Sequence, residues 1–365
     1  MKKLSHLMSI CLVFTLVASA LLIACAQSAP APTPAPAPKP APAPKPAPAP
    51  KMINWNLSLW GGPRGWTDPL EKWAEDMDKQ TNGQWKIKMH YGGVLAKQAD
   101  GLDGIKAGLF EATGMVGFFA PGKVPLSQAF GLPFVVPHDS RDIIRLAEAF
   151  GEHPAIVEEM GNWNARLLFT WFLEPFQFIG NKRIATVDDL KGVKIRVAPG
   201  PGKVLQKFGA ASVMVPTPEV YTALERGTID IMSPTIPSVW DNKWYEVSKY
   251  VTLEASLYSP YCFWVVSNDA WNALPKEFQQ LYIQSKPKVT EMLLEERIAS
   301  EKKAFEAFEE KGIEIIHFPP EERAKLVAEA KPVWDAWVEK AEADGLPGKK
   351  ILDFLLEKRK EITGE

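Results

Sequence analysis

The stretch Asp188-Asp189-Leu190-Lys191-Gly192-Val193-Lys194-Ile195-Arg196-Val197 decides the fold. It predicts a helical turn, then a glycine, then a short apolar strand that ends at Arg196 and Val197. The elements that follow alternate in the same way: helix over 203–208, strand over 212–216, helix over 220–226 and strand over 229–232. This β–α rhythm, which restarts after about residue 174, predicts an α/β lobe with helices covering a sheet.

An earlier part of the chain has the same rhythm and predicts another lobe. Its expected elements are strands over 53–59, 85–90 and 112–118 with helices over 67–81 and 102–109. The apolar strand over 262–267 is assigned to this first lobe, and one very long helical run over 276–311 is interrupted around Pro287. The predicted boundaries are lobe I over 52–174 plus 259–299, lobe II over 175–258 plus 300–328, and C-terminal helices over 329–365.

The first 51 residues predict attachment to a membrane. Residues 1–24 have a basic start and an apolar core, as secretory signal peptides do. Leu22-Ile23-Ala24-Cys25 resembles a bacterial lipobox, so Cys25 is expected to carry the lipid after cleavage. The alternative is a retained membrane helix, for which the 18 residues Leu7–Ala24, with Ser and Thr among them, are marginal in length. Residues 25–51 hold 11 of the 32 prolines, which predicts an extended polyproline tether rather than a folded element.

Charge and motifs exclude several classes of protein. The net charge of −2 becomes −7 without the five lysines of the first 51 residues, which argues against a nucleic-acid partner. Three cysteines, at 11, 25 and 262, cannot form a disulfide framework. The chain has no His-Glu-x-x-His, Gly-x-Ser-x-Gly or complete dinucleotide fingerprint. The sequence therefore predicts a protein that is not an enzyme.

Several stretches together resemble the substrate-binding subunit of tripartite ATP-independent periplasmic (TRAP) transporters. They are Thr81-Asn82-Gly83-Gln84-Trp85-Lys86-Ile87, Tyr91-Gly92-Gly93-Val94-Leu95, Phe130-Gly131-Leu132-Pro133-Phe134, the opening stretch 188–197, 215–224 with 227–230, and Lys243-Trp244-Tyr245-Glu246-Val247-Ser248-Lys249-Tyr250. The likeness extends from Met52 to the C-terminus, and it is the combination that is specific.

The resemblance implies an α/β, two-lobed periplasmic-binding-protein fold with a hinge and a long lobe-spanning helix. Such a lipoprotein receptor would bind a small organic acid between its lobes, on the extracytoplasmic face of the cell membrane, and deliver it to membrane permease subunits. In the family the arginine of the Lys-x-Arg strand, here Arg196, holds the ligand carboxylate. A planar guanidinium suits that task, although a structural ion pair is the alternative. A lipid-anchored periplasmic enzyme, or a sensor that reuses the receptor fold, remains the rival interpretation.

Two positions depart from family patterns. Gln177 stands where sialic-acid-type members have a further arginine, and it is similar to the keto-acid and lactate branch, where that side chain helps to hold a metal ion. The carboxylate which that branch supplies is replaced here by Ser233 and Pro234. The resemblance requires no cofactor, and it leaves open a Na⁺ or Ca²⁺ ion that bridges the ligand through Gln177 and carbonyl oxygens.

Aromatic side chains are expected to form the rest of the pocket, because they fall at strand ends or in βα loops, where open α/β sheets bind ligands. The predicted wall is Trp60, Phe119, Trp171 and Trp240, with Tyr221 and Ser233 as further ligand-binding residues. For Phe134, Trp244 and Tyr245, packing is the favoured role. One arginine among several rings suits a monocarboxylate with an apolar or aromatic body.

Overall fold

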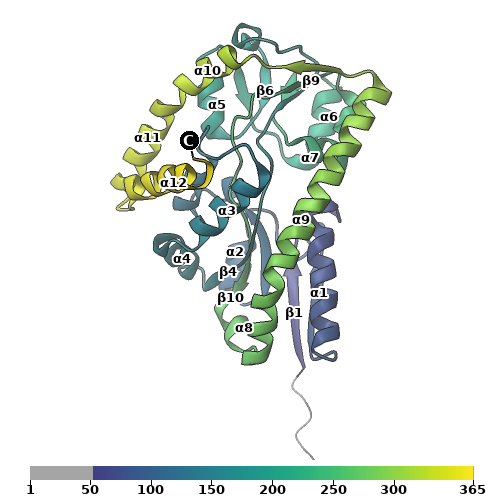
Figure 1. Ribbon diagram of the computed structural model, residues 1–365, viewed down its shortest axis with the longest axis vertical. Helices are drawn as coiled ribbons and strands as arrows, with labels where there is room; N and C mark the ends of the chain where they lie inside the picture. The colour runs from purple at the N-terminus through teal and green to yellow at the C-terminus, as the bar shows by residue number, and fades with distance from the viewer. Residues whose placement is uncertain (1–51, 365) are drawn as a thin grey trace, which may run out of the picture. The chain divides into compact units, whose positions relative to one another are not determined.

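The two alternating parts of the chain form two separate β-sheets, and this confirms the predicted α/β, two-lobed fold (Figure 1). The computed structural model describes residues 52–364, so the predicted signal peptide, Cys25 and the whole tether lie outside the described residues. We call the five-stranded sheet with its helices lobe I and the six-stranded sheet with its helices lobe II.

Lobe I is built on a mainly parallel sheet with one reversed strand. Its strands lie in the order β2 (Trp85–His90), β1 (Ile53–Ser58), β3 (Ala112–Val116), β10 (Cys262–Ser267) and β4 (Ala165–Trp171). Strand β10 is antiparallel to both of its neighbours. The helices of this lobe are α1 (Asp68–Gln80), α2 (Gly101–Lys106), α3 (Ser140–Gly151), α4 (Pro154–Gly161) and α8 (Asn268–Asn272).

Large rings fill the core of lobe I. Trp55, Trp73, Trp85 and Trp264 are each 1% exposed or less. They meet largely edge to face, as the Trp55 and Trp85 rings do at 4.8 Å between centroids. This geometry suits the quadrupoles of aromatic rings. These four of the 13 tryptophans therefore pack in the core of lobe I.

Lobe II has shorter strands. They lie in the order β11 (Glu314–His317), β9 (Tyr250–Leu253), β5 (Phe178–Gly180), β8 (Ile231–Met232), β6 (Lys194–Arg196) and β7 (Ala211–Val213). Its helices are α5 (Pro199–Gln206), α6 (Val220–Glu225) and α7 (Ile236–Asp241). The parallel strands β8, β6 and β7 bring their carboxyl ends to one edge, with Arg196 as the last residue of β6.

Three segments connect the lobes. Two are the chains between β4 and β5 and between β9 and β10, which pair where the Phe176 N–H donates to the Tyr258 carbonyl at 2.9 Å. The third is α9 (Lys276–Lys311), which packs on α1 of lobe I and on α7 of lobe II. The predicted interruption at Pro287 was wrong, because the helix is continuous through it. A proline inside a helix removes one backbone hydrogen bond, because it has no N–H group. The packing of α9 on both lobes compensates for that loss.

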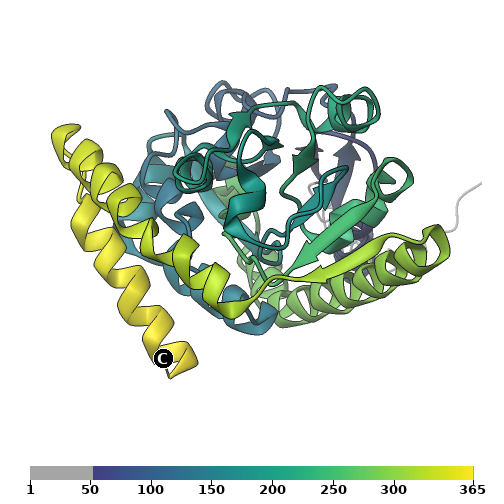
Figure 2. The same cartoon turned by 90° about the horizontal axis from the view of Figure 1, so that it is seen from above.

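The chain ends in three helices, α10 (Pro320–Ala328), α11 (Ala330–Ala343) and α12 (Gly348–Thr363). Figure 2 shows α11 and α12 side by side, at the opposite side of the two sheets from α9. The Trp334 indole donates to the Pro133 carbonyl at 2.8 Å, and Arg359 donates to the Phe134 carbonyl at 2.9 Å. No helix among residues 52–364 combines the length and the apolar character that crossing a bilayer requires.

Candidate functional site

A cavity lies between the lobes where the carboxyl ends of β1, β3 and β6 approach one another. Its walls come from the loops after β1 and β3, from the end of β4, from β6 and from α7. Its volume of about 60 Å³ is well below the several hundred Å³ usual for ligand pockets, so the lobes have to part for a ligand to enter. A hinge between two lobes allows that movement.

Arg196 is the charged group that lobe II contributes to this cavity. Its side chain is only 6% exposed, Nε donates to the Val215 carbonyl at 3.2 Å, and Nη2 donates to Thr217 Oγ1 at 3.3 Å. Nη1 has no acceptor among the described residues, and none of their carboxylates lies within 4.0 Å of the guanidinium. Burial lowers the pKa of Arg196, but the group stays charged at neutral pH. The site therefore holds a buried cation with an unused donor.

Lobe I supplies an aromatic wall, and three of the four predicted wall residues belong to it. Trp60, Phe119 and Trp171 line the cavity. Sequence reasoning missed Trp66, whose ring stacks on Trp171 at 4.4 Å between centroids with the planes 11° apart. Trp244 was assigned to packing, and it is buried in lobe II as well as lining the cavity.

Arg64 is a further cavity residue that sequence reasoning missed. It follows β1 in the loop Gly61-Gly62-Pro63-Arg64, and its guanidinium lies 4.5 Å from the centre of the Trp60 ring. Gly61 has a φ of +81°, and a Cβ there would meet Arg64 Nη2 at 1.8 Å, so the loop needs glycine at this point. The available signal was an arginine at the carboxyl end of the first strand.

The other predicted site residues do not line the cavity. Gln177 lies on a connecting segment, where Oε1 accepts from the Ser256 N–H at 3.2 Å and Nε2 donates to the Pro175 carbonyl at 3.1 Å. Ser233 is fully buried, and its N–H donates to the Arg196 carbonyl at 2.8 Å. Their roles in ligand binding stay predictions.

The two outlying aromatic residues have neighbours of their own in lobe II. The Trp240 ring on α7 stacks on Tyr245 with 5.6 Å between centroids, and the Tyr221 hydroxyl donates to Glu246 at 3.0 Å. Both interactions lie within lobe II, and neither Trp240 nor Tyr221 is among the residues that line the cavity. Ligand contact by these two rings also stays a prediction.

The residues around Gln177 do not fit a divalent cation. Its carbonyl oxygen already accepts a backbone hydrogen bond, and Ser233 and Pro234 offer no charge. Within residues 52–364, no three His, Cys, Asp or Glu side chains gather as metal ligands. Calcium binding needs several oxygens with carboxylates among them. The Na⁺ or Ca²⁺ ion expected at Gln177 stays a prediction.

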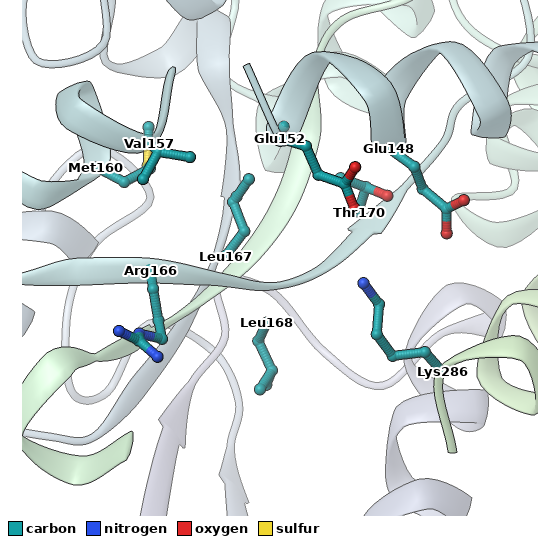
Figure 3. Close-up of a pocket in the computed structure, with 10 residues that line it drawn as sticks. Glu148, Glu152, Val157, Met160, Arg166, Leu167, Leu168, Thr170 and Lys286 are labelled. Carbon is teal, nitrogen blue, oxygen red and sulfur yellow. The ribbon is translucent and has the colours of Figure 1, made fainter. Parts of the chain in front are cut away.

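A larger cavity of about 290 Å³ lies on lobe I, between α3, α4 and β4 (Figure 3). Glu148 of α3 and Glu152, which directly follows this helix, face it from one side, and Arg166 and Lys286 face it from the other. It contains none of the residues predicted from the sequence. Its mixed charges and its position outside the junction of the lobes distinguish it from the cavity around Arg196.

Comparison with known proteins identifies the family. Residues 64–341 match the bacterial extracellular solute-binding protein family 7, DctP. The chain belongs to this family. Its receptors bind substrates for transport, and the match includes the cavity residues Arg64 and Arg196.

Relatives of this family 7 protein agree with that assignment. The chain is similar to the 2,3-diketo-L-gulonate-binding periplasmic protein YiaO of Escherichia coli (strain K12), with 27% identity over 67% of this chain and 75% of that protein. A TRAP solute-binding protein from a marine metagenome, specific for aromatic acid ligands, superposes with a TM-score of 0.77 and 20% identity over 86% of this chain and all of that one. A TRAP solute-binding protein of Rhodoferax ferrireducens T118 in complex with copurified benzoate superposes with a TM-score of 0.75. It shares 21% sequence identity, and the match covers 86% of this chain and 99% of that one. These structures confirm the fold.

Proposed function

We propose that this protein is a TRAP solute receptor that binds a small organic acid in the cavity between its lobes and presents it to membrane permease subunits. Arg196 holds the carboxylate, and the aromatic wall of lobe I contacts the body of the acid. Lobe closure brings the two together around the ligand. The protein performs no reaction on the ligand.

The unused Nη1 of Arg196 carries this proposal. A buried guanidinium that lacks a carboxylate partner is unfavourable, because transfer of a charge out of water is compensated only by pairing. A ligand carboxylate would supply the missing acceptor as a charge-assisted hydrogen bond, roughly twice as strong as a neutral one. Thr217 and the Val215 carbonyl hold the group in place before the ligand arrives.

The body of the acid is expected to be apolar or aromatic and flat. Trp60, Phe119 and the stacked Trp66–Trp171 pair offer ring faces across the cavity from Arg196. The relatives support this class in their own ligands, since one is specific for aromatic acids and another copurified with benzoate. The diketogulonate of the E. coli relative is also a carboxylate.

The place of action follows from the sequence of the first 51 residues. A lipid on Cys25 would hold the receptor at the membrane, and the proline-rich tether would let it reach the permease. The expected location is the extracytoplasmic face of the cell membrane. Labelling with a radioactive fatty acid in cells would test this, and a Cys25→Ala variant that still carries the label would contradict it.

Isothermal titration with a panel of aromatic and aliphatic carboxylates tests the function. We expect wild-type protein to bind at least one acid, and Arg196→Ala to bind it at least tenfold more weakly because a charged hydrogen-bond pair is lost. Arg196→Lys keeps the charge without the paired donors and is expected to lie between the two. The exposed Arg226→Ala is the matched control and should bind as wild type does. Unchanged affinity in Arg196→Ala would contradict the assignment.

Two rival functions are separated by other measurements. A periplasmic enzyme would turn over the acid that binds, so ligand recovered unchanged after long incubation supports the receptor. A sensor on the same fold would work without a transporter, so loss of uptake of that acid in cells that lack the receptor supports transport. Native mass spectrometry of freshly purified protein would identify a copurifying acid directly.

A further inference from the structure

The cavity contains two guanidinium groups, one from each lobe. Arg64 reaches it from the loop after β1 in lobe I, and Arg196 reaches it from the end of β6 in lobe II. None of the residues that line the cavity is an aspartate or a glutamate. The lining therefore has two positive charges and no negative one, which is more than a single carboxylate would neutralise.

Arg64 resembles Arg196 in how its donors are used. Its Nη2 donates to the Trp60 carbonyl at 2.7 Å and its Nε to the Gly62 carbonyl at 3.2 Å. Nη1 has no acceptor among the described residues, and no ion pair within 4.0 Å involves this guanidinium. Backbone carbonyls fix the group, while the donor that remains is free for a ligand.

Two indole rings hold the Arg64 guanidinium in place. It lies 4.5 Å from the centre of the Trp60 ring and 5.1 Å from that of Trp66. Rings at these distances attract the cation and remove water from it. Burial lowers the pKa of Arg64 to about 10, so the side chain is charged at neutral pH. Its position is thus set before any ligand binds, which reduces the entropy cost of binding.

We infer that Arg64 binds a second anionic group of the ligand, so that the receptor selects acids with two negatively charged groups, one held by each lobe. This inference rests on the proposed function and changes the expected ligand from a monocarboxylate to a dianion. Each end of a dianion would meet an unused guanidinium donor, and the rings would contact the part between the two ends. Binding across the cavity would also favour the closed arrangement of the lobes.

A structural role for Arg64 is the competing explanation. Asp241 on α7 of lobe II is the carboxylate with the strongest electrostatic effect on the pKa of Arg64. It lies nearer to Arg297, because Asp241 Oδ2 is 3.8 Å from Arg297 Nη1. If Arg64 served only to pair with Asp241, removal of either side chain would affect stability in the same way. Neither change would then alter the choice between acids with one charge and acids with two.

Titration with matched pairs of acids tests the inference in the full chain. Succinate against butyrate, and isophthalate against 3-methylbenzoate, keep the size similar and change one charge. For at least one pair we expect the dianion to bind at least tenfold more tightly to wild-type protein. Arg64→Met is expected to weaken the dianion at least tenfold and the monoanion less than threefold. Arg64→Lys should retain part of the preference, and the exposed Arg226→Met should retain all of it.

The outcomes separate this inference from the proposed function. Binding of monoanions as tight as that of dianions, or an unchanged preference in Arg64→Met, would overturn the inference and leave the receptor function standing. Equal losses of thermal stability in Arg64→Met and Asp241→Asn with no change in preference would assign Arg64 to the structural pair and also overturn it. Failure of every acid to bind wild-type protein would contradict both.

Discussion

Each lobe buries one ionisable side chain that has no oppositely charged neighbour within 4.0 Å among the described residues. The two side chains differ in how many of their hydrogen-bonding groups have a partner. Glu159 in lobe I accepts from the Leu126 N–H at 2.6 Å and from the N–H and hydroxyl of Ser127 at 3.1 and 2.5 Å. Arg196 in lobe II has two acceptors and an unused donor. Both side chains are 6% exposed.

The difference supports Arg196, and not Glu159, as the proposed ligand-binding residue. Both carboxylate oxygens of Glu159 accept hydrogen bonds from residues 126–127, so this side chain stabilises the turn there. Arg196 keeps capacity for a group that the described chain does not supply. Burial of a charge alone would have selected both residues, whereas the remaining hydrogen-bonding capacity selects the arginine at the cavity.

The largest effect is expected for a third buried charge, one that is paired with carboxylates. Arg297 on α9 donates to both oxygens of Glu174, at 2.9 and 2.6 Å, and to Thr235 at 3.0 Å. We expect Arg297→Met to lower the free energy of unfolding by about 3–5 kcal/mol, because it leaves buried carboxylates unpaired. Urea unfolding measures this. Arg141→Met, which removes an exposed pair with Glu291, should change the free energy of unfolding far less, because solvent screens exposed pairs. A similar small loss in Arg297→Met would refute the argument.

The second largest effect is expected for Glu159, whose raised pKa makes the free energy of unfolding depend on pH. Burial raises its pKa to about 7, from about 4.5 in the unfolded chain, although three hydrogen bonds oppose the shift. A raised carboxyl pKa stabilises the fold below pH 4.5, and the contribution is lost as the pH rises through 7. The loss is about 3 kcal/mol. Glu159→Gln should flatten the unfolding free energy between pH 4.5 and 7, and the exposed Glu158→Gln should not. Parallel profiles for wild type and Glu159→Gln would exclude the shift.

The smallest expected effect concerns the hydrogen-bond acceptors around Arg196. Thr217→Val removes the acceptor of Arg196 Nη2, and the expected cost is about 0.5–1.5 kcal/mol in binding of any carboxylate. Thr217 orients the arginine and is not part of the aromatic wall. The binding of aromatic and of aliphatic acids should therefore weaken by the same factor. Titration of both kinds of acid checks this, with the exposed Thr222→Val as control. A loss confined to aromatic acids would place Thr217 against the body of the ligand.

Much of the fold was predictable because its signals are local. Alternation of apolar and polar residues predicted β1 and β2, helical spacing predicted α1, and the apolar run Cys262–Ser267 lies in lobe I as expected. Strands β5 and β9 were missed because three or four residues show no usable alternation. Continuity of α9 through Pro287 depends on packing against both lobes, which no local pattern reports.

The site was predictable in part for the same reason. A strand that ends in Lys-x-Arg placed Arg196 at a sheet edge, and the loop aromatics Trp60 and Phe119 followed from their positions after strands. Arg64 and Trp66 needed knowledge of how the loop after β1 folds across the cavity. Its course depends on Gly61 at positive φ, which makes room for the guanidinium.

The C-terminal helices bear on how fast a ligand is exchanged. Val333 and Trp337 of α11 border the same space as Pro199 and Gly200 of α5 in lobe II, and Trp334 of α11 is bonded to lobe I. Any opening that carries α5 away from lobe I must therefore also disturb the packing of α11. We therefore expect the residence time of a bound acid to depend partly on a helix that does not line the cavity around Arg196.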